Sequence, residues 1–94
     1  MSNPRERNNC VSESIINAEE WVRTTGREAR IAISNIREGY DHAQALGMDE
    51  NGDWRWLTRH HSDGVLRQWD RHFDVEPYRY VSVEDFIKEQ ESAE

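Results

Sequence analysis

The chain has 94 residues and a mass of 11.2 kDa, enough for one domain with one modest hydrophobic core. It carries 19 acidic and 12 basic residues, and the net charge of −7 disfavours a surface built to bind nucleic-acid phosphates. Aliphatic residues are few, but four Trp and three Tyr supply large side chains for a core, so we expect a folded domain and not a disordered chain.

Membrane, secretion and disulfide signals are missing from the sequence. No apolar stretch approaches the ~18 residues that a membrane span needs, and the N-terminal segment lacks the apolar core of a secretion signal. Cys10 is the single cysteine, which excludes an internal disulfide and a thiolate zinc cage. We therefore expect a cytoplasmic protein that makes no contact with membranes.

The first ten residues are polar and show no periodicity, so we expect residues 1–10 to form a flexible N-terminus. From Val11 as far as Leu46, small and apolar residues recur every three or four positions. This spacing is typical of one face of a helix and predicts a long N-terminal helical region. Gly47 is suited to the left-handed residue that ends it.

The middle of this region carries a helix-breaking signal. Thr24 and Thr25 are β-branched and precede Gly26, and Thr25 with Glu28 matches a capping box. We expect a kink or break near Gly26. The apolar spacing continues through it unshifted, so the sequence leaves open whether residues 12–46 form one helix or two.

Four small residues follow one edge of the predicted helix at seven-residue intervals: Ala18, Thr25, Ala32 and Gly39. Small side chains let another helix approach closely. This edge predicts a helix–helix contact, either within the chain or across a two-fold homodimer.

The second half of the chain begins with a turn over residues 48–53, because Asn-Gly within it is a strong turn signal. Trp54–Leu57 follows this turn, and Tyr78–Val81 alternates in polarity, as a short strand does. We expect these two segments to pair as a two-stranded ribbon, if the ribbon packs on helices.

Two more helices are predicted. One spans residues 64–74, where Val65, Leu66, Trp69 and Phe73 share a face, and the other spans residues 83–91. The predicted fold is therefore mainly α: a single helical domain over residues 11–91 with three to four helices, an optional β ribbon, and a frayed acidic tail at residues 92–94.

A calcium loop is suggested by Asp49, Asn51 and Asp53, whose spacing matches the start of an EF-hand. Trp54 stands where that loop needs Gly, and His60 stands where it needs a bidentate Glu. We therefore interpret this segment as a turn.

Other catalytic and metal-binding patterns also fail. One cluster of possible ligands comprises His60, His61, Asp63, Asp70 and His72. No His pair in it has the spacing that places two imidazoles on one helical face, and adjacent histidines diverge. The sequence also lacks a nucleophile elbow and a phosphate-binding Gly loop. We expect a chain that is not an enzyme, with no cofactor and no bound metal.

Residues 54–80 interleave aromatic and cationic side chains, which leaves three readings open. Some of these aromatics are needed for the core. Protein interfaces also concentrate their binding energy in Trp, Tyr and Arg, and single-stranded nucleic acids stack on aromatics beside Arg. The net charge of −7 favours a protein partner with a basic surface.

We therefore interpret the chain as a protein-binding module that occludes a basic, nucleic-acid-binding surface of a host protein. In size, acidity and low cysteine content it resembles the inhibitors that phages and other mobile elements encode against host enzymes and defence systems. The resemblance covers this overall profile and no residue motif. The predicted contact residues are Asp49, Glu50, Asp53, Trp54, Arg55, Trp56, Tyr78 and Tyr80.

The alternative is a small nucleic-acid-binding or regulatory protein. It would use an arginine stripe along the predicted first helix together with the mixed segment. The residues concerned are Arg23, Arg27, Arg30, Arg37, Arg67 and Arg71. A solvated helix face with local ion pairs accounts for the same stripe without any ligand.

Overall fold

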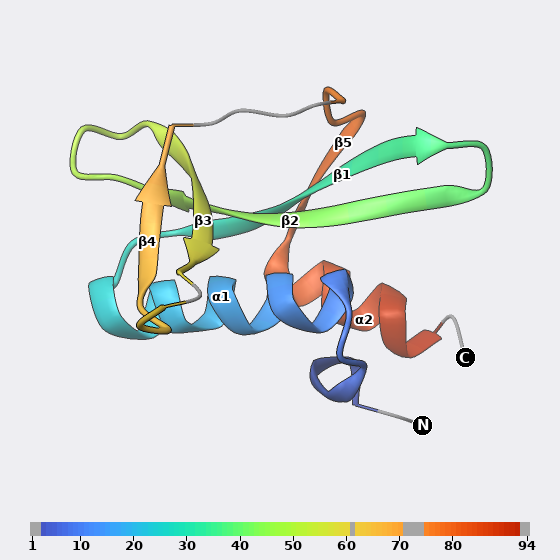
Figure 1. Cartoon of the computed structure of the whole chain (residues 1–94), viewed down its shortest axis with the longest axis horizontal. Helices are drawn as coiled ribbons and strands as arrows, with labels where there is room; N and C mark the ends of the chain where they lie inside the picture. Colours follow the sequence, from blue (N-terminus) through green and yellow to red (C-terminus); the bar gives the residue numbers. More distant parts are fainter. Residues whose placement is uncertain (1–2, 61, 71–74, 93–94) are drawn as a thin grey trace.

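A computed structural model describes residues 3–60, 62–70 and 75–92. It is an α+β fold in which a helix precedes an antiparallel meander of four strands, and a fifth strand and a second helix follow (Figure 1). The helical elements are η1 (Pro4–Glu6, a 3-10 helix), α1 (Cys10–Thr25) and α2 (Val83–Ser92). The strands are β1 (Ala29–Arg37), β2 (Tyr40–Met48), β3 (Trp54–Arg59), β4 (Leu66–Trp69) and β5 (Arg79–Ser82).

The five strands form one sheet in the order β4-β3-β2-β1-β5, and each neighbouring pair is antiparallel. Both helices lie on the same side of this sheet (Figure 1). We call this the helix side, and we call the opposite one the outer side. The fold therefore has two layers, with the main core between the helices and the sheet.

The core joins all the larger elements. Its buried apolar residues come from α1, α2 and four strands: Ile15, Ala18, Trp21, Ile31, Ile33, Ala43, Ala45, Leu57, Val81 and Phe86. Within β1 and β2 these residues occupy alternate positions, as the two-residue period of a strand requires. Alternation therefore fixes which side chains of each strand point to the outer side.

The α1 helix has well-formed ends. The Asn9 side chain accepts hydrogen bonds from the backbone N–H groups of Val11 and Ser12, and the Ser12 hydroxyl accepts one from the Asn9 N–H. At the other end Gly26 adopts a left-handed conformation (φ 72°) and donates its N–H to the carbonyl oxygen of Val22 at 2.9 Å. The break expected near Gly26 is therefore the end of the helix.

The prediction of a mainly α fold with three to four helices is wrong, because the chain after Gly26 enters two strands. The small and apolar residues between positions 29 and 46 that fitted a helical spacing lie on both sides of the sheet. Ile31 and Ile33 point to the helix side, whereas Ala32 and Leu46 point to the outer side and are also fully buried. Burial on both sides removes the simple alternation by which a strand is recognised.

The small residues of the predicted helix edge do not lie together. Ala18 lies in α1 and packs in the core, Thr25 ends that helix, Ala32 lies in β1 and Gly39 lies in the β1–β2 turn. No helix edge joins them, so the basis for a homodimer through this set is gone.

The strands expected in the second half exist, but their pairing differs. β3 pairs with β2 and β4, and β5 pairs with β1, so they do not form a ribbon with each other. The helix predicted over residues 64–74 is wrong, since Leu66–Trp69 is the edge strand β4; Phe73 lies outside the described residues. The last helix is confirmed as α2, and the Ser82 hydroxyl accepts the N–H of Asp85 at 3.1 Å.

The segment before α1 contacts both helices. The guanidinium of Arg5 donates two hydrogen bonds to the Glu19 carboxylate, at 2.7 and 2.6 Å. Arg7 donates to the side chain and the carbonyl oxygen of Gln90 in α2. Pro4 is buried. These contacts join the start of the chain to the helical layer.

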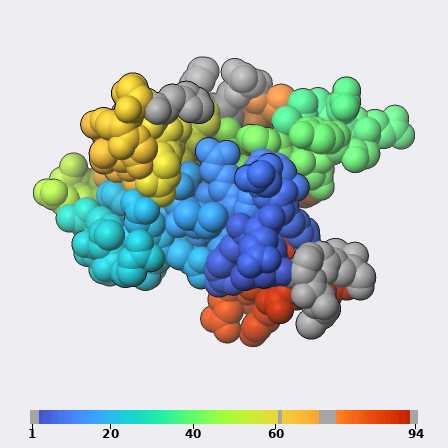
Figure 2. Space-filling view, turned by 60° about the horizontal axis from the view of Figure 1, so that its bottom comes forward, coloured from blue at the N-terminus to red at the C-terminus, as the bar shows by residue number. Residues whose placement is uncertain are grey.

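The far half of the β1–β2 hairpin extends beyond the rest of the sheet. β5 pairs with β1 only over Arg30–Ile33, and β3 pairs with β2 only over Leu46–Met48. The remaining residues form a two-stranded arm that projects from the molecule (green in Figure 2). Among the described residues, no helix combines the length and the apolar character needed to cross a membrane.

Candidate functional site

Four aromatic residues from three strands share the outer side of the sheet. Leu57 and Val81 point into the core, so the neighbouring Trp56 and Tyr80 point outward. Trp54 lies two residues from Trp56, and Trp69 is the cross-strand partner of Trp56. We call Trp54, Trp56, Trp69 and Tyr80 the aromatic face.

Arg30 connects Trp54 and Tyr80 across this face. Its guanidinium carbon lies 4.1 Å from the ring centre of Trp54 in β3 and 4.4 Å from that of Tyr80 in β5. A cation over an aromatic ring is attracted by the negative potential of the ring face. The arginine therefore links two aromatics that belong to different strands and holds them in fixed positions.

The aromatic face is only partly covered. Trp69 is 46% exposed and Tyr80 is 38% exposed, while Trp54 and Trp56 are half-buried. Exposure of several large aromatic side chains on one side of a small domain is unusual for a surface that contacts only water. This side of the sheet is therefore the strongest candidate for a binding surface.

An acidic turn borders the aromatic face where β2 joins β3. Asp49 Oδ1 accepts the backbone N–H groups of Asn51 and Asp53, at 2.8 and 2.9 Å, and Oδ2 accepts from the Arg55 guanidinium at 3.0 Å. These bonds, above all the one from the Asp53 backbone, hold the pKa of Asp49 below its usual value. Asp49 is thus a structural residue of the turn.

The other two carboxylates of the turn differ from Asp49. Glu50 has an 81% exposed side chain whose carboxylate lies 3.7 Å from the guanidinium of Arg27. Asp53 is exposed and directly precedes Trp54. The charges available to a partner at this turn are therefore those of Glu50 and Asp53.

Two predicted contact residues do not join the aromatic face. Arg55 points to the helix side, opposite to Trp54 and Trp56, and forms ion pairs with Asp49 and Asp70. The Tyr78 hydroxyl donates to Asp41 Oδ2 at 2.8 Å, which raises the pKa of Tyr78. The hydrogen bond from the Asn35 amide, and after it the one from Tyr78, lowers the pKa of Asp41. The predicted contact residues therefore do not form one continuous surface.

The arginine stripe does not exist as a continuous feature, because it depended on a helix that ends at Thr25. Its four members lie in different parts of the fold: Arg23 is exposed in α1, Arg27 meets Glu50, Arg30 lies between two aromatics and Arg37 lies over Tyr40. Of the two arginines predicted from the mixed segment, Arg67 pairs with Asp63, and Arg71 lies outside the described residues.

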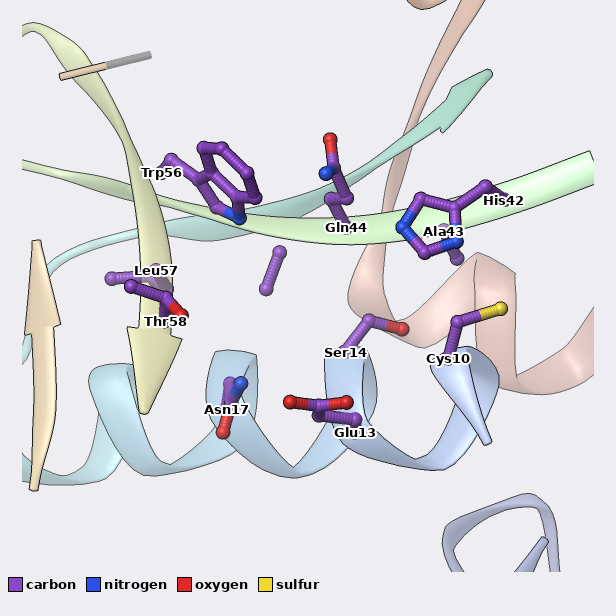
Figure 3. A pocket seen from close by; sticks show the side chains of 11 residues that line it. Cys10, Glu13, Ser14, Asn17, His42, Ala43, Gln44, Trp56, Leu57 and Thr58 are labelled. Atoms are coloured by element: carbon purple, nitrogen blue, oxygen red, sulfur yellow. The ribbon is translucent and has the colours of Figure 1, made fainter. Parts of the chain in front are cut away.

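The helix side holds a cavity of about 110 Å³ between α1, β2 and β3, lined by both polar and apolar residues (Figure 3). Cys10, Glu13 and Asn17 line it from the helix, and His42 and Gln44 line it from β2. In the described part of the chain, His, Cys, Asp and Glu residues form no group of three suited to a metal ion. His61 and His72 of the predicted cluster lie outside the described residues.

Sequence reasoning missed two members of the site. Trp69 was expected on the apolar face of a predicted helix, and Arg30 was expected in the arginine stripe. The sequence predicted a short strand at Trp54–Leu57 and paired it with Tyr78–Val81. In the fold β3 lies between β2 and β4, and this arrangement brings Trp69 beside Trp56.

The sequence and the fold were also compared with known proteins. Searches against protein-family models, curated proteins and solved structures find no match.

Proposed function

We propose that the chain is a protein-binding module without catalytic activity that holds its partner against the aromatic face. The observation that carries the proposal is the group of Trp54, Trp56, Trp69 and Tyr80, drawn from three strands, partly exposed and linked through Arg30. Trp, Tyr and Arg are the residues in which protein interfaces concentrate binding energy.

Preorganisation supports this role. Aromatic side chains fixed by neighbours lose little further conformational freedom when a partner binds. Arg30 fixes Trp54 and Tyr80, and Trp56 has Trp69 as its cross-strand neighbour on a pleated sheet. Such a rigid surface fits a folded protein better than a flexible ligand.

The charge of the chain supports a basic partner. The net charge is −7, and Glu50 and Asp53 lie in the turn that leads into Trp54. Long-range attraction would speed the approach of a basic surface, and the aromatics would then supply short-range contact. We propose that the chain acts in the cytoplasm and occludes a nucleic-acid-binding surface of a host protein, as inhibitors from phages and mobile elements do.

Nucleic-acid binding is the second candidate, and the placement of Arg30 between two aromatic rings is the observation in its favour. Against it, Arg27 and Arg67 lie beside carboxylates, and the net charge opposes phosphate binding. We therefore rank it second.

Two matched variants test the proposal. Trp69→Ala truncates an exposed residue of the aromatic face, and Val22→Ala truncates a residue of α1 that is 45% exposed on the helix side. Proteins captured from host lysate by the wild-type chain are identified by mass spectrometry, and their binding to each purified variant is measured by calorimetry. We expect Trp69→Ala to weaken binding of a specific partner at least roughly tenfold and Val22→Ala to leave it unchanged.

A salt titration separates the two candidates. If the chain binds single-stranded DNA or RNA with an affinity that falls steeply with salt, and Trp69→Ala removes this binding, the nucleic-acid function replaces the protein-binding one. Equal capture by Trp69→Ala and the wild type would remove the aromatic face as the contact surface.

A further inference from the structure

The strand β2 is paired along only half of one edge. Toward β1 it pairs from Tyr40 to Gly47, but toward β3 its pairing covers only Leu46–Met48. β3 then leaves the sheet plane toward α1, where Arg59 donates hydrogen bonds to Asn17 and Glu20. Among the described residues, no strand pairs with residues 40–45 on this edge.

The alternation of hydrogen bonds between β1 and β2 shows which backbone groups of β2 lie along the open edge. The N–H of Met48 donates to the carbonyl oxygen of Glu28 at 2.8 Å, so even-numbered residues of β2 bond to β1. The N–H and C=O groups of Ala43 therefore point away from β1, toward the gap. Antiparallel strands alternate in this way at every second residue.

The open edge lies beside the cavity on the helix side. Ala43 and Ala45 point their small side chains toward α1 and line this cavity of about 110 Å³. Glu13, Ser14 and Asn17 line it from the helix (Figure 3). A residue added opposite Ala43 would point its side chain the same way, into the cavity, because cross-strand partners share a side of the sheet.

Carboxylates outnumber the cations that are left unneutralised around this space, because Arg5 and Arg59, which share a neighbouring hollow with Glu13, are paired with Glu19 and Glu20. Glu13 lines the cavity, and a second hollow under the arm, which shares Cys10, His42 and Ala43 with it, is lined by Asp41 and Glu89. Glu89 is paired with Arg79, whereas Asp41 accepts hydrogen bonds from the neutral groups of Tyr78 and Asn35. Glu13 and Asp41 therefore leave net negative charge beside the open edge.

We infer that the open edge of β2 binds an extended segment of a basic partner protein as an additional antiparallel strand. A Lys or Arg side chain of that segment enters the cavity beside Glu13. Main-chain hydrogen bonds to Ala43 provide affinity, and the cavity selects the side chain. The inference rests on the proposed function and names how the same partner is held.

The position of Trp56 connects the two surfaces. It belongs to the aromatic face and also lines the cavity. A strand on the β2 edge would point every second side chain to the outer side, next to Trp56, and the others into the cavity. One partner can therefore contact the aromatic face and the β2 edge together.

The test uses the peptide Ac-Thr-Val-Lys-Val-Thr-amide and nitrogen-15 NMR of the full chain. We expect saturable shifts of the Ala43 amide at millimolar peptide. Methylating the backbone nitrogen of the lysine blocks its hydrogen bond to Ala43 and should weaken binding roughly tenfold. Methylating the following valine, whose N–H points away from β2, should leave binding within about twofold of the parent peptide.

The side-chain part of the inference has its own control. Glu13→Gln should weaken the lysine peptide severalfold and leave a norleucine peptide unchanged. Glu76→Gln removes the same charge from an exposed carboxylate outside the cavity lining and should change neither. If both mutations act equally, the cavity does not select a cation.

Two results would overturn the inference: the absence of saturable shifts at Ala43, or equal loss of binding with both methylated peptides. Neither result bears on the Trp69→Ala experiment, which tests the aromatic face alone. Loss of partner binding in Trp69→Ala with no peptide binding at β2 would retain the proposed function and remove the added strand.

Discussion

The indole ring of Trp21 lies directly against the backbone of Gly47. A Cβ atom at position 47 would lie 2.7 to 2.8 Å from three atoms of the ring, closer than van der Waals contact allows. The ring is also held in place, since its Nε1 donates a hydrogen bond to the Met48 carbonyl oxygen at 3.2 Å. This contact sets the distance between α1 and β2.

Gly47→Ala should therefore destabilise the fold. The added methyl group must displace a ring that is both packed and hydrogen-bonded, and such overpacking costs about 1–3 kcal/mol. Urea denaturation of the wild type and the variant measures the loss. In a Trp21→Leu background the same substitution should cost much less, and equal costs in both backgrounds would contradict the contact as its cause.

Arg30→Lys should destabilise the protein although the charge is kept. A lysine ammonium lacks the flat guanidinium that lies between Trp54 and Tyr80, and the loss of stacking should cost about 1 kcal/mol. Near-ultraviolet circular dichroism should change together with the denaturation midpoint. Arg37→Lys is the control: Arg37 lies 5.2 Å from the ring centre of Tyr40 on the exposed arm, and its replacement should change stability little.

Asp49 should make stability depend on acid pH. Because its folded pKa lies below the unfolded value, the carboxylate stabilises the fold above about pH 4, and this contribution is lost as the pH falls through the folded pKa. Asp49→Asn should be less stable than the wild type at neutral pH, and the difference should shrink in acid. Denaturation curves at several pH values measure it.

The matched control for that experiment is Glu50→Gln in the same turn. Glu50 is largely exposed, so this variant should follow the wild-type curve at every pH. A constant difference between Asp49→Asn and the wild type from neutral to acid pH would show that the Asp49 charge has no part in the stability of the turn.

Arg59 should hold the β3–β4 hairpin against α1. It donates to Asn17 Oδ1 at 3.2 Å, to Glu20 Oε1 at 2.9 Å and to the Gly64 carbonyl oxygen at 2.7 Å. Arg59→Met should cost about 1 kcal/mol and speed hydrogen exchange in β3 and β4 more than in β1. Arg67→Met removes an exposed ion pair with Asp63 and should change exchange little. Uniform acceleration over all strands would contradict the local role of Arg59.

Local signals predicted the local structure well. The Asn51-Gly52 pair marked the β2–β3 turn, and the helix predicted over residues 83–91 is α2, whose first turn is capped by Ser82. Both depend on hydrogen bonds between residues at most four positions apart, and such bonds can be predicted from short stretches of sequence. The end of α1 at Gly26 was detected for the same reason, although it was interpreted as a break.

The sheet was missed because its evidence is not local. One edge of β1 pairs with β2, which follows it directly, but the other edge pairs with β5, which lies about fifty residues further along the chain. The candidate site was predictable to the same extent. Trp54, Trp56 and Tyr80 were predicted as contact residues because their segment is rich in aromatic and cationic side chains. The contact of Arg30 with Trp54 and Tyr80 depends on the strand order, which the sequence did not reveal.

The strand order β4-β3-β2-β1-β5 also constrains the order of events during protein synthesis. Arg30 and Ser82 are partners in the sheet, yet roughly fifty residues separate them, so a ribosome must release β5 before β1 gains its second neighbour. Until then β1 is an edge strand of the nascent meander, and the core lacks the cover of Phe86. We expect the sheet to be completed only after residues 79–86 have left the ribosome.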